Sequence, residues 1–293
     1  MKSNDLEGQL YIVTGANSGI GRVTAQELAL RGAHVVVAGR SRERCEAVAA
    51  DLRARLHAEL GRQVDAAGAP ARIDVLALDL AELASVRAAA AQVIDRGWRI
   101  CGLINNAGVA GSRGRTRDGF EVAFGVNHLG HFLFTRLLET RLRDSAPARV
   151  VNVSSDAHLR VRGVDFDVLN KPTQTRTGLR EYGVSKLCNV LFTRELARRW
   201  AGSGITSYAL HPGVIASDIW RHVPQPLRWL MTRFMATPED GAATTLMCAT
   251  APELAGASGR YYRNQHEARP NRVVEDDALA DRLWRESERM AGL

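Results

Sequence analysis

Short apolar runs alternate with longer segments of helical periodicity along most of this chain. The apolar runs are four to eight residues long and end in glycine or polar residues, as buried strands do. They lie in "QLYIVT" (9–14), "HVVVAGR" (34–40), "IDVLALDL" (73–80), "GLINNAG" (102–108), "ARVVNVSS" (148–155) and "ITSYALHPG" (205–213). Helical spacing is found at about 22–33, 41–60, 84–94, 116–141 and 181–200.

This alternation predicts an α/β fold. Parallel strands need long crossovers, and helices on both faces of the sheet bury it. We therefore predict a Rossmann-type doubly wound parallel sheet of about seven strands. The loop-like segments 61–72 and 169–178 start no new pattern, so residues 1–293 are predicted to form a single domain. A substrate lid is expected at about 214–237 and a C-terminal helix at about 275–290.

Composition narrows the class of protein. The chain is 45% hydrophobic and 24% charged, which is typical of a globular protein. No apolar run is long enough to span a membrane, and "MKSNDLEGQL" lacks the apolar core of a secretory signal, so we expect a cytoplasmic protein. The net charge of +7 comes from dispersed arginines with no basic block, which argues against a nucleic-acid partner.

Cysteine and histidine give no sign of a metal site. Neither residue type has the spacing of metal ligands, so no metal is predicted. We interpret the cysteines as reduced, buried thiols and the histidines near the motifs as structural. The residues concerned are Cys45, Cys101, Cys188, Cys248, His128, His131, His158 and His211.

The segment "TGANSGIG" joins the first predicted strand to a helix. Glycine permits a tight turn and a close approach to a pyrophosphate, whose charge is then stabilised by the helix N-terminus. An ordinary strand-to-helix turn is the alternative. The residues expected to contact a dinucleotide are Gly15, Asn17, Ser18, Gly19, Ile20 and Gly21.

The second predicted strand ends at Arg40, with Arg42 and Arg44 close behind. An NAD enzyme is expected to carry an acidic residue here for the ribose 2′-hydroxyl, whereas arginine suits a 2′-phosphate. The pattern favours NADP(H), although a surface arginine at the start of a helix remains an alternative.

In "YGVSKLCNVLF", Tyr182 and Lys186 share one helix face, away from an apolar stripe. A free phenol has a pKa of about 10, and a neighbouring ammonium group would lower it. Tyr182 could then act as an acid or base, but from the pair alone an ordinary solvated helix surface is the better explanation. Ser154 and Ser155 end a nearby strand, at the edge of the sheet where ligands bind.

In the order "TGANSGIG", "NNAG", "VNVSS", "YGVSK" and "HPG", the chain resembles the short-chain dehydrogenase/reductase superfamily from about residue 8 to about 265. The blocks "FGVNHLGHFLFT", "VVNVSSDAH" and "SKLCNVLFTRELARRW" resemble its retinol-dehydrogenase-like branch, which includes the WW-domain-containing oxidoreductase.

The resemblance implies a catalytic tetrad. Tyr182 is the expected acid/base, Lys186 lowers its pKa and binds the nicotinamide ribose, and Ser155 hydrogen-bonds the substrate oxygen. Asn127 is expected to hold a water that connects the lysine to solvent. Further expected cofactor contacts are Asp79, Leu80, Asn105 or Asn106, Ala107, Gly108, Tyr182, Lys186, Pro212, Gly213 and Val214, with Arg40 supporting NADP(H).

These observations predict an NADP(H)-dependent oxidoreductase that transfers a hydride between nicotinamide and a lipophilic carbonyl or alcohol. Reduction of a ketone or aldehyde is favoured, because a cellular pool rich in NADPH drives that direction. The large apolar groups of residues 219–235 predict a retinoid, steroid or polyketide-like substrate, with packing on the core or a membrane-facing or partner-facing patch as the alternatives. A homodimer or homotetramer is expected, built on the helices near 116–141 and 181–200.

Two other functions remain open. One is a non-catalytic dinucleotide-binding sensor or scaffold, and the other is an alcohol dehydrogenase working in the oxidative direction. The chain departs from its branch in the long segment 53–71, whose role is open, and in the absence of an N-terminal hydrophobic anchor.

Overall fold

The computed structural model describes residues 4–60, 72–213 and 237–293. The expected lid at 214–237 therefore lies, except for its last residue, outside the described residues. Val214 and most of the long 53–71 segment lie outside them as well.

One sheet forms the centre of the protein, and the predicted α/β doubly wound class is confirmed. The strand order is β3-β2-β1-β4-β5-β6-β7-β8, with parallel pairing throughout except for the antiparallel β7–β8 pair. The described sheet has eight strands, one more than expected, because the chain turns back after β7 to form the short β8. The strands are β1 (Leu10–Thr14), β2 (His34–Gly39), β3 (Ile73–Ala77), β4 (Ile100–Asn105), β5 (Ala148–Val153), β6 (Ile205–His211), β7 (Arg260–Arg263) and β8 (His266–Glu267).

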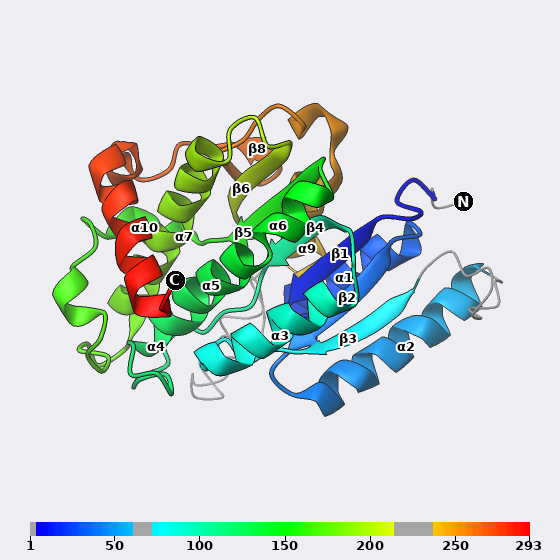
Figure 1. The fold of residues 1–293 in the computed structure, drawn as a ribbon, viewed down its shortest axis with the longest axis horizontal. Helices are drawn as coiled ribbons and strands as arrows, with labels where there is room; N and C mark the ends of the chain where they lie inside the picture. The colour runs from blue at the N-terminus through cyan, green and yellow to red at the C-terminus, as the bar shows by residue number, and fades with distance from the viewer. Residues whose placement is uncertain (1–3, 61–71, 214–236) are drawn as a thin grey trace.

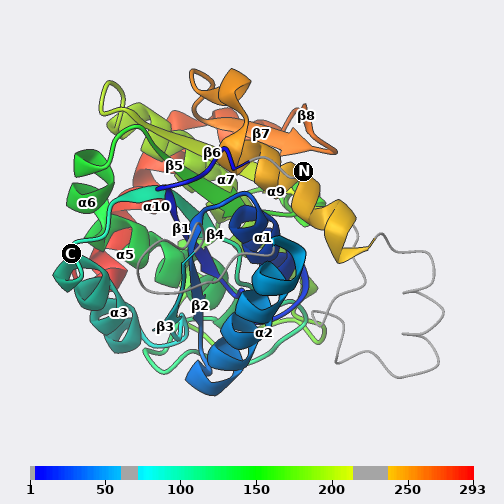
Figure 2. The same ribbon diagram turned by 90° about the vertical axis from the view of Figure 1, so that its right-hand side faces the viewer.

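Helices cover both faces of the sheet (Figure 1). Figure 2 shows α1, α2 and α9 on one side of the strands and α3, α5 and α10 on the other. The bounds are α1 (Gly19–Leu30), α2 (Arg42–Leu60), α3 (Leu83–Asp95), α4 (Val122–Phe124), α5 (Gly130–Leu137), α6 (Glu139–Asp144), α7 (Leu179–Arg199), α9 (Pro238–Thr250) and α10 (Asp277–Ala291). Shorter 3-10 helices are η2 (Asp156–Arg160), η3 (Phe166–Val168), η5 (Pro252–Leu254) and η6 (Arg272–Glu275).

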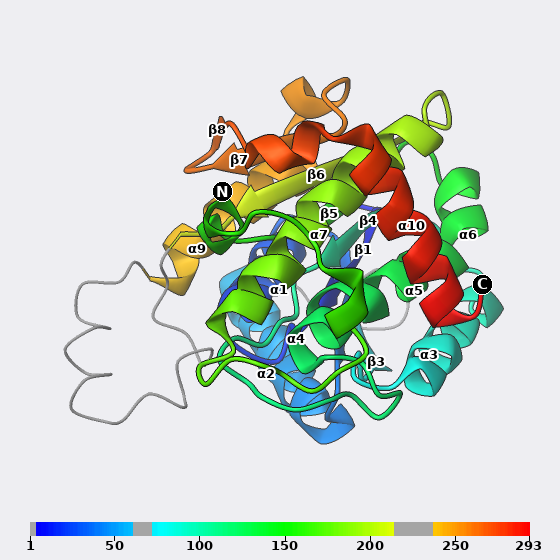
Figure 3. The ribbon, with the colours of Figure 1, turned by 90° about the vertical axis from the view of Figure 1, so that its left-hand side faces the viewer.

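Two apolar clusters hold these layers together. The first contains Leu28 of α1, Leu52 of α2 and Cys248 of α9, and the second contains Phe132 of α5, Leu187 of α7 and Leu283 of α10. Helix α10 packs across α7 and α5, as Figure 3 shows. The four cysteines are free thiols, and Cys101 alone among them is partly exposed.

The long helix expected from about Thr116 to Arg141 differs from the structure. Residues 116–121 form a turn, in which the Thr116 amide donates to Phe120 O, and the helix begins only at Val122, where Glu121 accepts from the Phe124 amide at 2.8 Å. A π-helical turn, η1 (Gly125–Leu129), then interrupts it. A Cβ at Gly130 would approach Leu80 O to 2.7 Å, so the helix lies very close to the loop after β3.

The parallel register brings several strand ends to one edge. Asn105 at the end of β4 pairs with Asn152 of β5, and Val153 pairs with Leu210 of β6. The Asn105 amide donates to Asn152 Oδ1 at 2.8 Å and to Thr135 Oγ1 at 3.1 Å inside the core. The loops that follow these strands therefore meet above a buried layer in which side-chain hydrogen bonds join β4, β5 and α5.

Candidate active site

A cavity of about 560 Å³ runs along the carboxyl ends of the strands, where ligands of doubly wound sheets bind. It extends from the glycine turn after β1 to α7. The expected cofactor residues that line it are Gly15, Asn17, Ser18, Gly19, Ile20, Gly21, Arg40, Asp79, Leu80, Asn106, Ala107, Gly108, Tyr182, Lys186 and Pro212. Gly213 is described but does not line it.

Adjacent asparagines at the end of β4 face different surroundings. Asn105 is 1% exposed and bonded into the core, whereas Asn106 lines the cavity. The Asn106 amide donates to Thr14 O at 2.8 Å, which ties the loop after β4 to the end of β1. Asn106 is therefore the cavity-lining residue, and Asn105 is a structural one.

The glycine turn provides a close cradle for a pyrophosphate. Gly15 and Gly19 have φ of 66° and 51°, which other residues rarely adopt. A Cβ at Gly21 would approach Asn106 Nδ2 to 2.4 Å and Gly15 O to 2.5 Å. Ser18 caps α1 without a side-chain hydrogen bond, and the first turn of α1 has no acidic residue, so the helix N-terminus is electrostatically suited to an anion. The residues present fit a dinucleotide.

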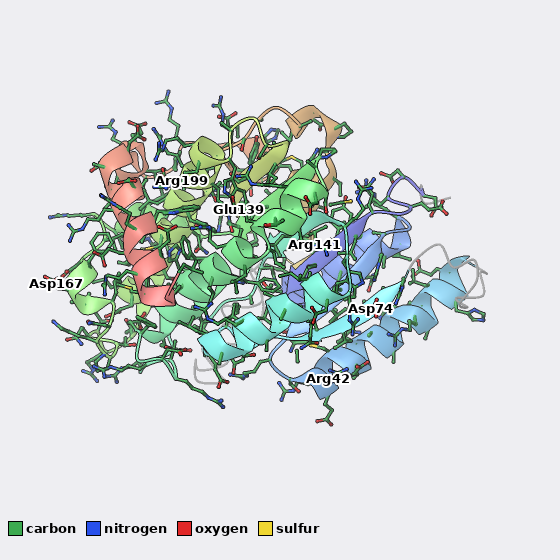
Figure 4. All side chains as sticks on the ribbon, in the orientation of Figure 1. Arg42, Asp74, Glu139, Arg141, Asp167 and Arg199 are labelled. Carbon is green, nitrogen blue, oxygen red and sulfur yellow. The ribbon has the colours of Figure 1, made fainter. Side chains whose placement is uncertain are left out.

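The three arginines after β2 have different surroundings. Arg40 and Arg44 line the cavity, and neither makes an ion pair within the described part of the chain. Arg42, the first residue of α2, is labelled in Figure 4. It instead pairs with Glu46 at 3.7 Å on the surface of that helix. Arg40 and Arg44 are thus the guanidinium groups positioned to meet a ligand phosphate.

Lys186 is buried beneath the cavity floor, with 3% of its surface exposed. Its Nζ donates to Val153 O at 2.8 Å and lies 5.7 Å from the centroid of the Tyr182 ring. Burial disfavours the ammonium form and lowers the pKa of Lys186 to about 7. Near neutral pH, without a ligand, the side chain is therefore close to half protonated.

Tyr182 is a neutral phenol at pH 7. Burial raises the pKa of its hydroxyl above the usual value, and a hydrogen bond with the Ser155 side chain acts in the opposite direction. The expected lowering of this pKa is not found in the ligand-free protein, because desolvation dominates and Lys186 is only about half protonated near pH 7. The structure brings Ser155 and Tyr182 together, as the tetrad requires.

Asn127 lies in the π-helical turn and links two parts of the site. Its Oδ1 accepts from the Val109 amide at 2.8 Å, and its Nδ2 donates to Val109 O at 3.0 Å and to Ser185 Oγ at 2.9 Å. The wide turn thus holds the loop after β4 against α7. The expected water beside Asn127 stays a prediction.

His131 connects this turn to the end of β1. Burial lowers the pKa of His131 to about 4, so its ring is neutral at pH 7. Nδ1 lies 3.0 Å from Asn127 O and must carry the proton, because a carbonyl only accepts. Nε2 then accepts from Thr14 Oγ1 at 2.8 Å, and Thr14 accepts from the amides of Asn106 and Ala107 at 3.0 Å each.

Sequence reasoning treated His131 as structural and did not single out Thr14. The structural interpretation holds, but the position is specific: His131 fixes both the cofactor turn and the helix that carries Asn127. Only its place four residues after Asn127 in the sequence hinted at this link. No cluster of potential metal ligands is found among the residues that the structure describes.

Comparison with known proteins agrees with the site. The family model for short chain dehydrogenases matches residues 9–166. The dehydrogenase/reductase SDR family member 13 of Bos taurus is 48% identical over 98% of this chain and 74% of its own length. Human retinol dehydrogenase 13 is 44% identical over 98% of this chain and 86% of its own length.

Solved structures share the fold. A crystal structure from Mycobacterium paratuberculosis has a TM-score of 0.75 at 34% identity, covering 98% of this chain and 94% of that one. The Pseudomonas aeruginosa RhlG/NADP complex has a TM-score of 0.66 at 27% identity, over 90% of this chain and 97% of that one. A Brucella melitensis 3-ketoacyl-(acyl-carrier-protein) reductase complexed with NADH has the same fold, with a TM-score of 0.64 at 24% identity, over 88% of this chain and 96% of that one.

The chain therefore belongs to the short-chain dehydrogenase family of oxidoreductases. Within that family it falls in the retinol-dehydrogenase-like branch, as its identity with retinol dehydrogenases over nearly its whole length shows. None of the helices described is long and apolar enough to cross a membrane.

Proposed function

We propose that this protein is an NADP(H)-dependent oxidoreductase that reduces a lipophilic ketone or aldehyde, with Tyr182 as the proton donor. The observation that carries the proposal is a single cavity with the anion-binding glycine turn at one end and Tyr182 and Lys186 at the other. A dinucleotide needs both ends: a cradle for its phosphates and a reactive centre where its nicotinamide meets the substrate.

The cofactor, when bound, supplies a hydride to the carbonyl carbon of the substrate. Ser155 and Tyr182 donate hydrogen bonds to the oxygen on which negative charge develops, and the Tyr182 proton then passes to that oxygen. The raised pKa of Tyr182 keeps the phenol protonated and ready for this step at neutral pH. The proton is afterwards restored from solvent.

The oxidative direction has the opposite requirement. Tyr182 would have to begin as a phenolate, which burial disfavours and only a fully charged Lys186 would favour. Action as an alcohol dehydrogenase thus needs a higher pH or an added positive charge near Tyr182. We therefore place reduction first.

The preference for NADP(H) rests on charge. Arg40 and Arg44 line the cavity beyond the end of β2 without an ion-pair partner among the described residues, where an NAD enzyme would carry a carboxylate. Two free guanidinium groups attract a 2′-phosphate and gain little from a 2′-hydroxyl. The RhlG relative, which carries NADP, is consistent with this assignment.

A lipophilic substrate is supported by the composition of residues 219–235 and by the names of similar proteins. The apolar side chains of residues 219–235 lie outside the described residues, so the lid remains a sequence-based prediction. Two relatives are named retinol dehydrogenases, and retinol is a lipophilic alcohol. We propose that a bulky apolar carbonyl of the retinoid, steroid or polyketide-like kind is the substrate.

The experiment compares the native protein with Tyr182→Phe. Consumption of NADPH and of NADH is followed over a graded set of carbonyls, from small polar ketones to retinal and steroid ketones. We expect turnover of the apolar carbonyls with NADPH and a loss of at least a thousandfold in the variant, because the proton donor is removed and the ring is kept.

Two results would overturn parts of the proposal. Faster turnover of small polar ketones than of every bulky apolar one would exclude the lipophilic assignment. Binding of NADPH without turnover of any carbonyl, or of any alcohol with NADP, would favour the non-catalytic sensor or scaffold.

A further inference from the structure

A second cavity, of about 600 Å³, lies behind the helices that carry the candidate catalytic residues. Three segments supply most of its lining: the start of α4, the loop from Arg160 to Leu169 and the start of α7, and Gln174 completes it. None of its lining residues lines the cofactor cavity. Its volume is within the range of about 300–1,000 Å³ that is usual for small-molecule sites.

The loop over this cavity is held in place by several contacts. The Glu121 amide donates to Leu169 O at 2.8 Å, and Asn271 Nδ2 donates to Val161 O at 2.7 Å. The Arg282 guanidinium of α10 lies 4.3 Å from the centroid of the Phe166 ring. Figure 4 labels Asp167 on this loop, at the edge of the molecule beside α10. The cavity is thus formed by the fold itself, without a ligand.

Its walls combine apolar surface with charge. The apolar residues come from all three segments: Phe124, Val161, Val164, Val168, Leu169 and Val184. Apolar walls of this kind bury the hydrocarbon part of a ligand.

The three acidic residues of the lining are occupied by the protein. Glu121 accepts from Thr173 Oγ1 at 2.6 Å and from the Phe124 amide, and Glu181 accepts from the Thr175 amide at 2.8 Å and from its hydroxyl. Asp165 accepts from the Asp167 amide at 3.1 Å. These carboxylates stabilise the walls.

The three basic residues of the lining have no such partner. Arg160, Arg162 and Arg180 line the cavity, and within the described residues none of them makes an ion pair. A guanidinium presents its donors in a planar fork that matches an anionic head group. The cavity therefore has apolar walls and unpaired cations together.

We propose that this second cavity binds an amphipathic anion, a molecule with an apolar tail and a carboxylate or phosphate head. The tail lies against the apolar walls, and the head is bound by Arg160 of the loop and Arg180 of α7. The site is independent of the hydride-transfer function proposed above.

The position of the cavity connects it to the catalytic helices. Glu181 and Val184 of α7 line it, while Tyr182 and Lys186 of the same helix line the cofactor cavity. Phe124 lines it just before the π-helical turn that holds Asn127. A bound ligand thus contacts the opposite faces of both elements without touching the reacting atoms.

The test is calorimetric titration of the full-length protein, saturated with NADPH so that the cofactor cavity is filled. The probes are dodecanoate, dodecyl phosphate and uncharged dodecan-1-ol, each below its aggregation concentration. We expect at least one anionic probe to bind, the tighter of the two identifying the head group, and the alcohol to bind at least tenfold more weakly. Dodecan-1-ol binding as tightly as both anions would overturn the proposal.

Matched variants separate the site from general charge. The double variant Arg160→Ala, Arg180→Ala is expected to weaken binding of the anionic probe at least tenfold, and Val168→Trp, which fills the cavity, to abolish it. The control Arg99→Ala, Arg269→Ala removes the same charge from exposed positions outside the lining and should bind as the native protein does.

Unchanged binding in both the double variant and Val168→Trp would refute the site. Binding that appears only without NADPH would also refute it, because the probe would then occupy the cofactor cavity. Both results concern binding alone, so neither depends on whether a substrate has been found.

Discussion

Replacing Lys186 by methionine is expected to stabilise the ligand-free protein while removing a candidate catalytic group. Lys186 is 3% exposed, and burial lowers its pKa from 10.5 to about 7. Between pH 7 and pH 10.5, Lys186 stays protonated in the unfolded chain but loses its proton in the folded protein. The free energy of unfolding of the native protein therefore rises with pH between about 7 and 10.5.

The magnitude follows from that interval. Each pH unit corresponds to about 1.4 kcal/mol, so the burial of the ammonium costs about 5 kcal/mol when complete and about 4 kcal/mol at pH 7. Methionine keeps most of the apolar stem but loses the hydrogen bond to Val153 O, worth about 1 kcal/mol. Val153 O still accepts from Asn189 Nδ2 at 3.2 Å. We expect a gain of about 3 kcal/mol at pH 7.

The assay is urea unfolding of both proteins without cofactor at pH 7 and pH 10. The gain should shrink by about 3 kcal/mol at the higher pH, because Lys186 is then neutral in the folded protein and pH 10 is only half a unit below its unfolded pKa of 10.5. Lys171→Met, at an exposed position, serves as the control and should show no such change between the two pH values. A Lys186→Met protein that is less stable than the native one at pH 7, or a gain that is the same at both pH values, would refute the reasoning.

Three further predictions concern the cofactor cavity. Arg40→Glu should lower kcat/KM for NADPH at least tenfold and raise the relative use of NADH. Arg42→Glu is the control, because the native Arg42 pairs with Glu46, and it should change the ratio of kcat/KM for NADPH to that for NADH little. Steady-state rates with both cofactors decide this. Gly21→Ala should weaken NADPH binding at least tenfold, because its Cβ would approach Asn106 Nδ2 to 2.4 Å. Gly256→Ala is the control, because nothing lies near its Cβ, and NADPH binding followed by fluorescence titration should be unchanged in it. His131→Phe should raise KM for NADPH and lower the free energy of unfolding by about 2–4 kcal/mol, because Thr14 Oγ1 and Asn127 O lose their hydrogen-bond partner. Equal KM in both proteins would show that His131 does not position the glycine turn after β1.

The fold could be predicted because its signal is local and repeated. Each apolar run between glycine or polar residues became a strand, and the long helical segments became α1, α2, α3 and α7. The π-helical turn around Asn127 was not predictable, because it arises where the helix packs against the loop at Leu80, far away in sequence. The edge strand β8 was not predicted, and β7 was included only in the expected total of about seven, because both strands are short.

The residues of the candidate site could be predicted from the sequence, but the pKa values of its groups could not. The sequence motifs brought Ser155, Tyr182 and Lys186 together, as the structure does. The pKa of Tyr182 was predicted in the wrong direction, since it depends on burial by several distant segments. The choice between Asn105 and Asn106 likewise required the orientation of the end of β4, which the letters "NN" do not specify.

The strand order has a consequence for the kinetics of folding. β1 pairs with β2 close by in sequence, but its other neighbour is β4, where Leu10 meets Ile100. Thr14 and Asn106, 92 positions apart, join at this junction and form part of the cofactor cavity. Because pairings between distant segments form slowly, the cavity is completed only when the two halves of the sheet join. During refolding, helical circular dichroism should return first, and the ability to bind NADPH should return with the slowest phase.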